Sequence, residues 1–284
     1  MSATDQPGRL MLAALARNWQ ARIGAGTVIA LAAFCFAGPL LYRTNQVTVN
    51  LNLKDLAPGA SHPLGTDDTG YDVLGRLMLA GQSSLELGFA VAIATTALGT
   101  AYGAIAGIAG GIIDGIMMRI IDTLLAIPWL VLLLIMVNIF PPSLWTIIAL
   151  LSVLSWLGVA RLVRGEVISL RTREFVLAAR TMGATTGRIL ARHMVPNAIG
   201  VIVVSATFSV ADAILALSTL SFLGLGLPPP HTDWGTMLTS GLDDLFNGYW
   251  WLVYPPAAIL IVTIVAFSLV GDAVRDSLDA RLRR

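Results

Sequence analysis

Long apolar runs occupy most of this chain and restrict what it can fold into. A helix needs about 20 apolar residues to cross a bilayer, and inside the hydrocarbon every backbone group must be bonded within a helix or a closed barrel. With 56% hydrophobic and 12% charged residues among 284, the composition is that of a membrane protein. The pattern predicts an all-α, polytopic membrane protein with six transmembrane helices at about 23–41, 85–107, 112–140, 144–160, 198–220 and 252–271.

The remaining segments connect these runs without dividing the chain into domains. Residues 1–22 carry three arginines and are expected to form an amphipathic lead-in on the cytoplasmic side. A cleavable signal peptide is rejected in favour of a signal anchor, because further spans follow and no clean small-residue cleavage site does. We expect an extracytoplasmic segment at 42–84 and a single transmembrane domain over 23–284. Pro128 predicts a kink in the third apolar run, since proline removes a helical hydrogen bond.

The basic residues indicate on which side of the membrane each segment lies. Short cytoplasmic loops carry an excess of lysine and arginine. With six spans and both termini inside, fifteen of the 18 basic residues fall on the cytoplasmic side, and only Arg43, Lys54 and Arg76 fall outside. The sequence therefore predicts a multi-pass protein whose N- and C-termini are both cytoplasmic.

The segment 161–197 is the one long charged stretch between apolar runs, and it contains seven arginines: Arg161, Arg164, Arg171, Arg173, Arg180, Arg188 and Arg192. A short helix is predicted inside it, because apolar residues recur at i, i+3, i+4 and i+7, namely at Phe175, Ala178, Ala179 and Met182. Gly183 supplies a C-terminal stop. Thr185 or Thr186 can cap a second helix, which Pro196 closes. We expect a helix–turn–helix docking element on the membrane surface.

Several strings in the chain resemble one family of transport proteins. Ala178-Ala179, followed by Gly183 and then, after nine residues, by HMVPN at 193–197, resembles the EAA loop of ABC importer permeases. The wording EFVLAARTMGA is that of the dipeptide/oligopeptide/nickel family, in its C-type permease subunit. Further strings similar to that family are HPLGTDDTGYDVL at 62–74, SFLGLGL at 221–227 and GDAVRDSLD at 271–279.

This resemblance implies the type I ABC importer permease fold, whose cytoplasmic coupling helices sit in a cleft of an ATPase subunit and transmit its closure. The coupling residues are then Glu174, Leu177, Ala178, Ala179, Gly183 and Pro196. Leu177 stands where the family has an acidic residue. Glu174 could partly replace the lost charge, although from a different face of the helix. Tyr71 stands where the family usually has an arginine.

The resemblance also implies partners: a second permease subunit in a heterodimer, two ATP-binding subunits and an extracytoplasmic solute-binding protein, in the bacterial cytoplasmic (inner) membrane. The chain has no G-x-x-x-x-G-K-[ST] phosphate loop. ATP and Mg are therefore expected on partner subunits, and this chain is predicted to be a transport subunit without a cofactor or catalytic residue of its own. Its predicted cargo is a di- or oligopeptide, with nickel or a metallophore as the alternative.

The fifth apolar run contains Asp212, and an unpaired charge is costly there. Spacings of three, four and seven place it on one face with other small or polar residues: Ser205, Ser209, Ala216 and Thr219. This stripe either lines a translocation path or bonds to neighbouring helices, and both interpretations stay open. A different class of protein, an ion-coupled secondary transporter with Asp212 as its ion site, is the second hypothesis.

Other candidate residues receive structural interpretations. His62, Asp67 and Asp72 are interpreted as turn and cap residues rather than metal ligands, because no second histidine or cysteine accompanies them. The single Cys35 excludes a disulfide framework. Glycines at 99, 103 and 107 predict close approach of another helix. An interfacial aromatic belt is predicted from Trp234, Tyr249, Trp250, Trp251 and Tyr254.

Overall fold

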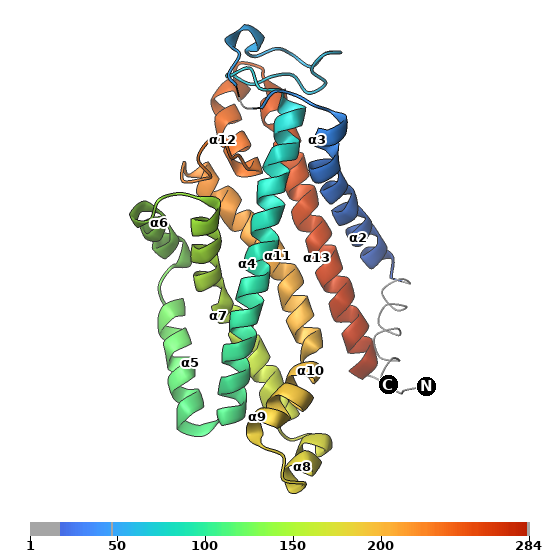
Figure 1. Cartoon of the computed structure of the whole chain (residues 1–284), viewed down its shortest axis with the longest axis vertical. Helices are drawn as coiled ribbons and strands as arrows, with labels where there is room; N and C mark the ends of the chain where they lie inside the picture. Colours follow the sequence, from blue (N-terminus) through green and yellow to red (C-terminus); the bar gives the residue numbers. More distant parts are fainter. Residues whose placement is uncertain (1–17, 47, 283–284) are drawn as a thin grey trace.

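The structure is a computed structural model that describes residues 18–46 and 48–282. Within this part of the chain the protein is a bundle of helices (Figure 1). The longer helices are α2 (Trp19–Ala32), α4 (Val73–Ala109), α5 (Gly111–Leu125), α6 (Trp129–Ile139), α7 (Leu144–Leu170), α11 (Ile199–Phe222), α12 (Trp234–Leu245) and α13 (Tyr254–Leu282). The shorter ones are η1 (Ala33–Ala37), α3 (Gly38–Leu41), η2 (Leu51–Leu53), α8 (Glu174–Thr181), α9 (Thr186–Ile189), η3 (Leu190–Met194), α10 (Val195–Asn197) and η4 (Trp250–Leu252).

The all-α, polytopic prediction is confirmed. In the described part of the chain, five continuous helical stretches are long and apolar enough to cross a membrane: Trp19–Leu41, Val73–Ala109, Leu144–Leu170, Ile199–Phe222 and Trp250–Ser277. The α5–α6 pair is the sixth candidate, and it is bent by 78° at the break around Pro128. The kink predicted at this proline is therefore present. Most of the proposed lead-in, residues 1–17, lies outside the described residues.

Several helices extend further than the apolar runs predict. α4 begins at Val73, so residues 73–84 are helical although they were expected in the extracytoplasmic segment. The reason is a cap: the Asp72 carboxylate accepts a hydrogen bond of 2.8 Å from the Gly75 amide, which satisfies one of the free donors at a helix start. At 37 residues α4 is about 55 Å long. It therefore exceeds the roughly 30 Å of a bilayer's hydrocarbon.

α7 and α13 also outlast their apolar runs. α7 continues to Leu170, ten residues past the predicted end of the fourth span. α13 continues to Leu282 and includes the string GDAVRDSLD. α12 was not predicted at all. Charged residues at the end of an apolar run do not stop the helix. They shorten only the part of it that lies in hydrocarbon.

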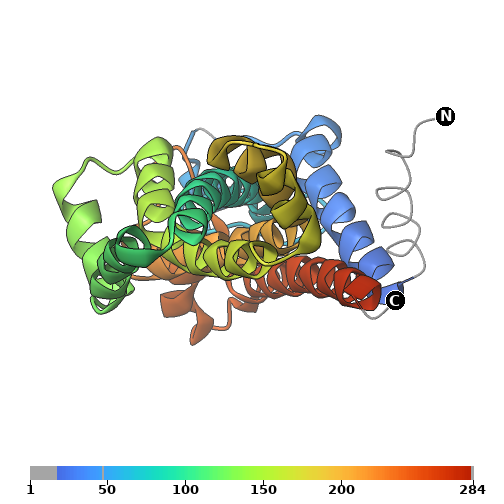
Figure 2. The ribbon, with the colours of Figure 1, turned by 90° about the horizontal axis from the view of Figure 1, so that it is seen from below.

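The two ends of the bundle differ in character (Figure 1), and Figure 2 looks onto the lower of them. One end, called here the arginine-rich end, carries α8, α9, η3 and α10, and the lower end of α13 lies on the same side. The other, the loop end, carries residues 42–72 together with α12. α4 runs the whole height between them. α11 lies at the centre and packs against α4, α7, α12 and α13.

A seam of glycines joins α4 to α7, its main packing partner. A Cβ at Gly99 would lie 2.6 Å from the Cβ of Val159, and one at Gly107 would lie 2.8 Å from Cγ1 of Val167. At Gly103 a Cβ would press directly on the backbone carbonyl of Ala160. The close helix approach predicted from the spacing of these glycines is confirmed, since small residues are what let two membrane helices meet at the backbone.

Replacing Gly103 by valine should destabilise the bundle, because its side chain has no space against the α7 backbone. The expected loss is about 1–3 kcal/mol, the usual cost of overpacking, measured as unfolding of the detergent-solubilised complex. Gly158→Val is the matched control, since it is a helical glycine with no described atom within 4 Å of its Cβ position. Equal stability of the two variants would contradict the seam.

Two of the aromatic residues assigned to the interfacial belt are core residues instead. Trp234 is fully buried, and its indole Nε1 donates to the Leu77 carbonyl at 3.1 Å. Trp251 is also buried and donates to the Thr66 carbonyl at 3.2 Å. The two indoles thus fasten the C-terminal half of the chain to α4 and to the loop that precedes it. The neighbouring Trp250 is half-exposed, as a belt residue would be.

Candidate functional site: the arginine-rich end and the polar face of α11

α8 is anchored to the bundle by one side of its surface. Val176 and Ala179 are buried, and they belong to a cluster with Val167 and Leu170 of α7 and with Met194 of η3. Glu174 lies in its first turn and Arg180 in its last, which is the charge order that the helix dipole favours. The short helix is therefore held in place by packing and not by local propensity alone.

The end of α8 is a complete Schellman motif. Gly183 takes a φ of +80°, the left-handed region that glycine enters without a steric penalty. Its amide donates to the Arg180 carbonyl at 3.0 Å, and the Ala184 amide donates to the Ala179 carbonyl at 3.0 Å. The stop predicted at Gly183 is present, and it turns the chain sharply toward α9.

The other side of α8 is an exposed apolar surface, defined here as the α8 surface: Phe175, Leu177, Ala178, Met182 and Gly183. Met182 is 81% exposed and Leu177 48%. No described atom lies within 4 Å of a Cβ built on Gly183. Of the predicted stripe, Ala179 faces the bundle, while the other three members are exposed. The α8 surface is thus an apolar face without a covering element in the described part of the chain.

Glu174 is closer to the coupling positions than the sequence argument allowed. It is exposed, like Leu177 and Ala178, and residues three and four apart are neighbours on a helix surface. Its carboxylate therefore stands one turn from the position where the related family has its acidic residue, on the exposed part of the same helix.

The second helix of the predicted pair is less regular. Thr185 occupies the N-cap of α9, but without a side-chain capping bond to any described residue. α9 passes into the π-helical η3 and then into α10. Pro196 does not close the segment as predicted. It lies in the first turn of α10, where the N–H that proline lacks would have no partner within the helix. A single residue, Ala198, separates α10 from α11.

Three of the seven arginines fasten the bundle instead of forming a free basic surface. Arg164 binds Asp114 of α5 through two hydrogen bonds of 2.5 and 2.6 Å. Arg161 pairs with Asp122 on the same helix. Arg171 donates to the Gly107 carbonyl at the end of α4, at 3.2 Å. These contacts tie α4 and α5 to the part of α7 that leads directly into α8.

The predicted polar stripe on α11 is divided by the structure. Asp212 is exposed on the surface of the chain, and Thr219 is partly exposed on the same side. Ser205 is buried, and its hydroxyl has no hydrogen-bond partner among the described residues. Ser209 is half-buried between them. The Thr219 hydroxyl donates to the Leu215 carbonyl of its own helix at 2.8 Å. Only the Asp212 side of the stripe is open to a path.

At the loop end, Asp72 joins three segments. Its Oδ2 accepts from the Tyr42 hydroxyl at 2.8 Å and lies 2.8 Å from Nδ1 of His62, while its Oδ1 caps α4. Burial, followed by the bond to Asp72, raises the pKa of Tyr42 to about 12. Asp67 accepts from the Thr69 amide at 3.0 Å, as a turn residue does. The cap and turn interpretation of these residues is confirmed.

Tyr71 and Arg76 form a further contact at this end. The Arg76 guanidinium lies 4.5 Å from the centroid of the Tyr71 ring, a cation–π geometry. Its Nε is 3.8 Å from an Asp67 carboxylate oxygen. Tyr71 stands where the family that the sequence resembles usually has an arginine, and in this chain it stacks on Arg76.

Sequence reasoning missed a fully buried carboxylate, Asp233. Its Oδ2 accepts from the hydroxyls of Ser221 at 2.8 Å and Thr236 at 2.7 Å. Its Oδ1 accepts from the amides of Gly235 at 2.8 Å and Thr236 at 3.1 Å. Four donors hold one charge and join the start of α12 to the end of α11. The signal for the helix was the aspartate before Trp-Gly-Thr, a typical N-cap position.

The part of the chain that the structure describes is a polytopic bundle of membrane-length helices with an anchored, exposed helical pair at one end. The chain belongs to the family described as binding-protein-dependent transport system inner membrane component, which matches residues 99–284. This family is one of transport permeases. The matched region begins within α4 and includes the whole arginine-rich segment.

Named relatives extend the similarity to nearly the whole chain. The dipeptide transport system permease protein DppC of Bacillus subtilis is 40% identical over 270 residues, which are 95% of this chain and 84% of the relative. The oligopeptide transport system permease protein OppC of the same organism is 39% identical over 94% of this chain and 87% of its own. OppC of Salmonella typhimurium is 37% identical, over 89% and 84% respectively.

Proposed function

We propose that this chain is the translocating subunit of an ATP-driven peptide importer, and that its α8 surface is where an ATP-binding subunit docks. The observation that carries the proposal is the division of α8. Val176 and Ala179 fix it to the bundle, while Ala178 and Leu177 are left exposed. A rigidly held helix with an uncovered apolar face can receive a push from a partner and pass it to α7 and α11.

Peptides are the proposed cargo. Relatives at 36–40% identity carry the names of dipeptide, oligopeptide and peptide permeases. Asp212 on the exposed side of α11 is suited to bind the ammonium group of a peptide, because a carboxylate accepts charge-assisted hydrogen bonds from such a cation. A second permease subunit would close the path on that side.

The arrangement in the membrane is part of the same proposal. In this proposal the arginine-rich end and both termini lie in the cytoplasm, because short cytoplasmic segments of membrane proteins carry an excess of arginine and lysine. The loop end then faces outward and meets the solute-binding protein. Two ATP-binding subunits, carrying ATP and Mg, would contact the cytoplasmic side, one through this chain and one through the second permease.

Transport by the purified complex tests the proposal. The chain is expressed with its neighbouring transport genes, purified with its partners and placed in proteoliposomes with labelled di-, tri- and pentapeptides and with labelled nickel. We expect peptide uptake that needs ATP and the binding protein. Uptake of nickel without uptake of any peptide would show that nickel and not a peptide is the cargo. Uptake driven by a proton gradient without any ATPase would replace the mechanism with that of an ion-coupled transporter.

Replacing Asp212 by alanine should lower peptide uptake on the order of tenfold, since one hydrogen bond between a charged donor and acceptor is lost. Asp212→Asn, which keeps the shape without the charge, should be nearly as slow. Ser268→Ala is the control, because its hydroxyl bonds only to the Ile264 carbonyl of its own helix among described residues. Unchanged uptake in both Asp212 variants, at equal expression, would remove the residue from the path.

A further inference from the structure

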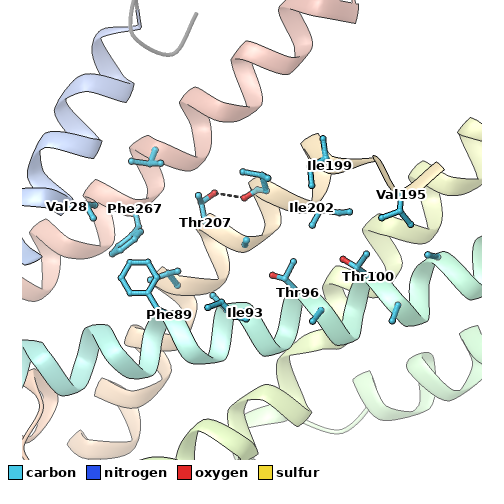
Figure 3. Close-up of a pocket in the computed structure, with 18 of the residues that line it drawn as sticks. Val28, Phe89, Ile93, Thr96, Thr100, Val195, Ile199, Ile202, Thr207 and Phe267 are labelled. Atoms are coloured by element: carbon cyan, nitrogen blue, oxygen red, sulfur yellow. Dashed lines mark hydrogen bonds between the residues drawn. The ribbon is translucent and has the colours of Figure 1, made fainter. Parts of the chain in front are cut away.

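A long apolar groove lies between α2, α4, α11 and α13, and neither the proposed docking surface nor the proposed path uses it (Figure 3). Its volume is about 1060 Å³. Residues of its wall such as Ile93 and Ile199 are 70% and 53% exposed, so the groove opens on the surface of the bundle. Among the described residues that line it none is ionisable, and three are threonines.

The groove and the Asp212 side are on opposite sides of α11. Val203 and Val210 line the groove at a helical spacing of seven residues. Asp212 follows Val210 by two residues and is therefore about 200° around the helix. Ionisable side chains in membrane helices avoid lipid and face a path or a partner. The groove side of α11 lacks ionisable side chains, as a side in contact with hydrocarbon would.

The dimensions of the groove fit a lipid chain. Along α4 it extends from Phe89 to Ile105, a rise of about 24 Å over 16 residues. One leaflet supplies about 15 Å of hydrocarbon depth. An acyl chain entering from the arginine-rich end therefore has room for its full length. Toward the loop end, the edge-to-face pair of Phe89 and Phe267, with ring centroids 5.6 Å apart, narrows the space.

Positive charge stands at the entrance. Arg188 and Arg192 belong to the short segment whose residues Leu190, Ala191 and Val195 line the groove at this end. Both are exposed, and neither forms an ion pair with another described residue. By contrast, Arg161 and Arg164 are paired with carboxylates.

We propose that this groove binds an anionic phospholipid from the leaflet at the arginine-rich end, with an acyl chain along α4 and the phosphate held by Arg188 and Arg192. Basic residues above an apolar crevice between membrane helices are the general form of such a site. Arginine binds phosphate oxygens in a bidentate manner. The bound lipid would fill the space between α4 and α11 and hold η3 at the membrane surface.

Lipid selectivity of the complete transporter complex in nanodiscs tests the charge part of this site. Spin-labelled phosphatidylglycerol and phosphatidylcholine are the probes, and the immobilised fraction is measured by electron paramagnetic resonance. We expect a preference for phosphatidylglycerol that falls about fivefold for each arginine replaced by glutamine. Arg119→Gln, an exposed arginine of α5 remote from the groove lining, should leave the preference unchanged. A double variant at positions 188 and 192 with unaltered preference would overturn the proposal.

A second pair of variants tests the groove itself. Ala101→Phe places a ring in the groove and should reduce the immobilised fraction of both lipids, whereas Ala149→Phe, at an exposed position on α7, should not. A photoreactive benzoylphenylalanine at position 101 should crosslink to lipid. Crosslinking to the second permease subunit instead would show that a helix occupies the groove and would overturn the proposal.

Discussion

Replacing Ala178 by tryptophan should abolish peptide uptake and release the ATP-binding subunit, while the chain itself remains folded and inserted. Ala178 is exposed on α8, so a large side chain meets no described neighbour of the bundle. It would instead occupy the space into which the partner's backbone must fit. We expect uptake to fall by at least about a hundredfold, the scale set by loss of close to 3 kcal/mol at an interface hot spot. The measurement is uptake together with the amount of ATPase that co-purifies.

The adjacent residue supplies the matched comparison. Ala179 is 3% exposed and packs in the cluster beneath α8. Ala179→Trp should therefore reduce folding and membrane levels as well as uptake, because overpacking strains the core. The α8 surface is disproved as a docking site if Ala178→Trp still co-purifies with the ATPase and transports normally. If Ala178→Trp failed to fold as Ala179→Trp should, the exposed position of Ala178 would be wrong, and with it the basis for docking at this surface.

Replacing Asp233 by alanine should cause the largest loss of stability. The carboxylate is fully buried and accepts from the hydroxyls of Ser221 and Thr236 and from the amides of Gly235 and Thr236. Removing it leaves the Ser221 hydroxyl and the Gly235 amide buried without this acceptor. The expected cost is about 3–5 kcal/mol, the usual range when one member of a buried charged network is deleted. This corresponds to a fall in the melting temperature on the order of 10 °C.

Asp233→Asn separates the loss of charge from the loss of geometry. The amide oxygen can still accept from the two backbone donors, and the hydroxyls can rotate to accept from the amide nitrogen. This variant should therefore lose less than half as much stability as Asp233→Ala. Thermal unfolding of the solubilised complex measures both. If Asp233→Ala melts with the unaltered protein, the network between α11 and α12 contributes nothing to the fold.

The membrane fold could be predicted because the main requirement of a membrane-spanning helix, a run of about 20 apolar residues, is visible in the sequence. Apolar runs of spanning length, the glycines of the α4–α7 seam and the proline break after α5 all act through local sequence. The length of α4 could not be predicted from apolarity, because its first turns are stabilised by the Asp72 cap and by packing under Trp234. The N-cap of α12 at Asp233 was visible in the sequence, but its contact with Ser221 was not, since that contact crosses from one helix to another.

The candidate sites divide in the same way. The stop at Gly183 was predictable because the left-handed conformation is a property of one residue. The apolar stripe on α8 was predicted without its division between an exposed and a buried side. Val176 and Ala179 face the bundle, and Phe175 and Met182 face away, because the partner for the inward side comes from α7 and η3. Periodicity reveals that a helix has an apolar face, but only tertiary contacts show what covers it.

The glycine seam makes α4 and α7 a rigid pair at the centre of the molecule. α4 is gripped by α7 along the seam, and the Arg171 bond to the Gly107 carbonyl fixes its far end beside α8. A displacement applied at α8 should therefore tilt α4 as a rigid helix, with little bending. The α5–α6 arm lacks this continuity, because its helix is interrupted by the 78° bend beside Pro128.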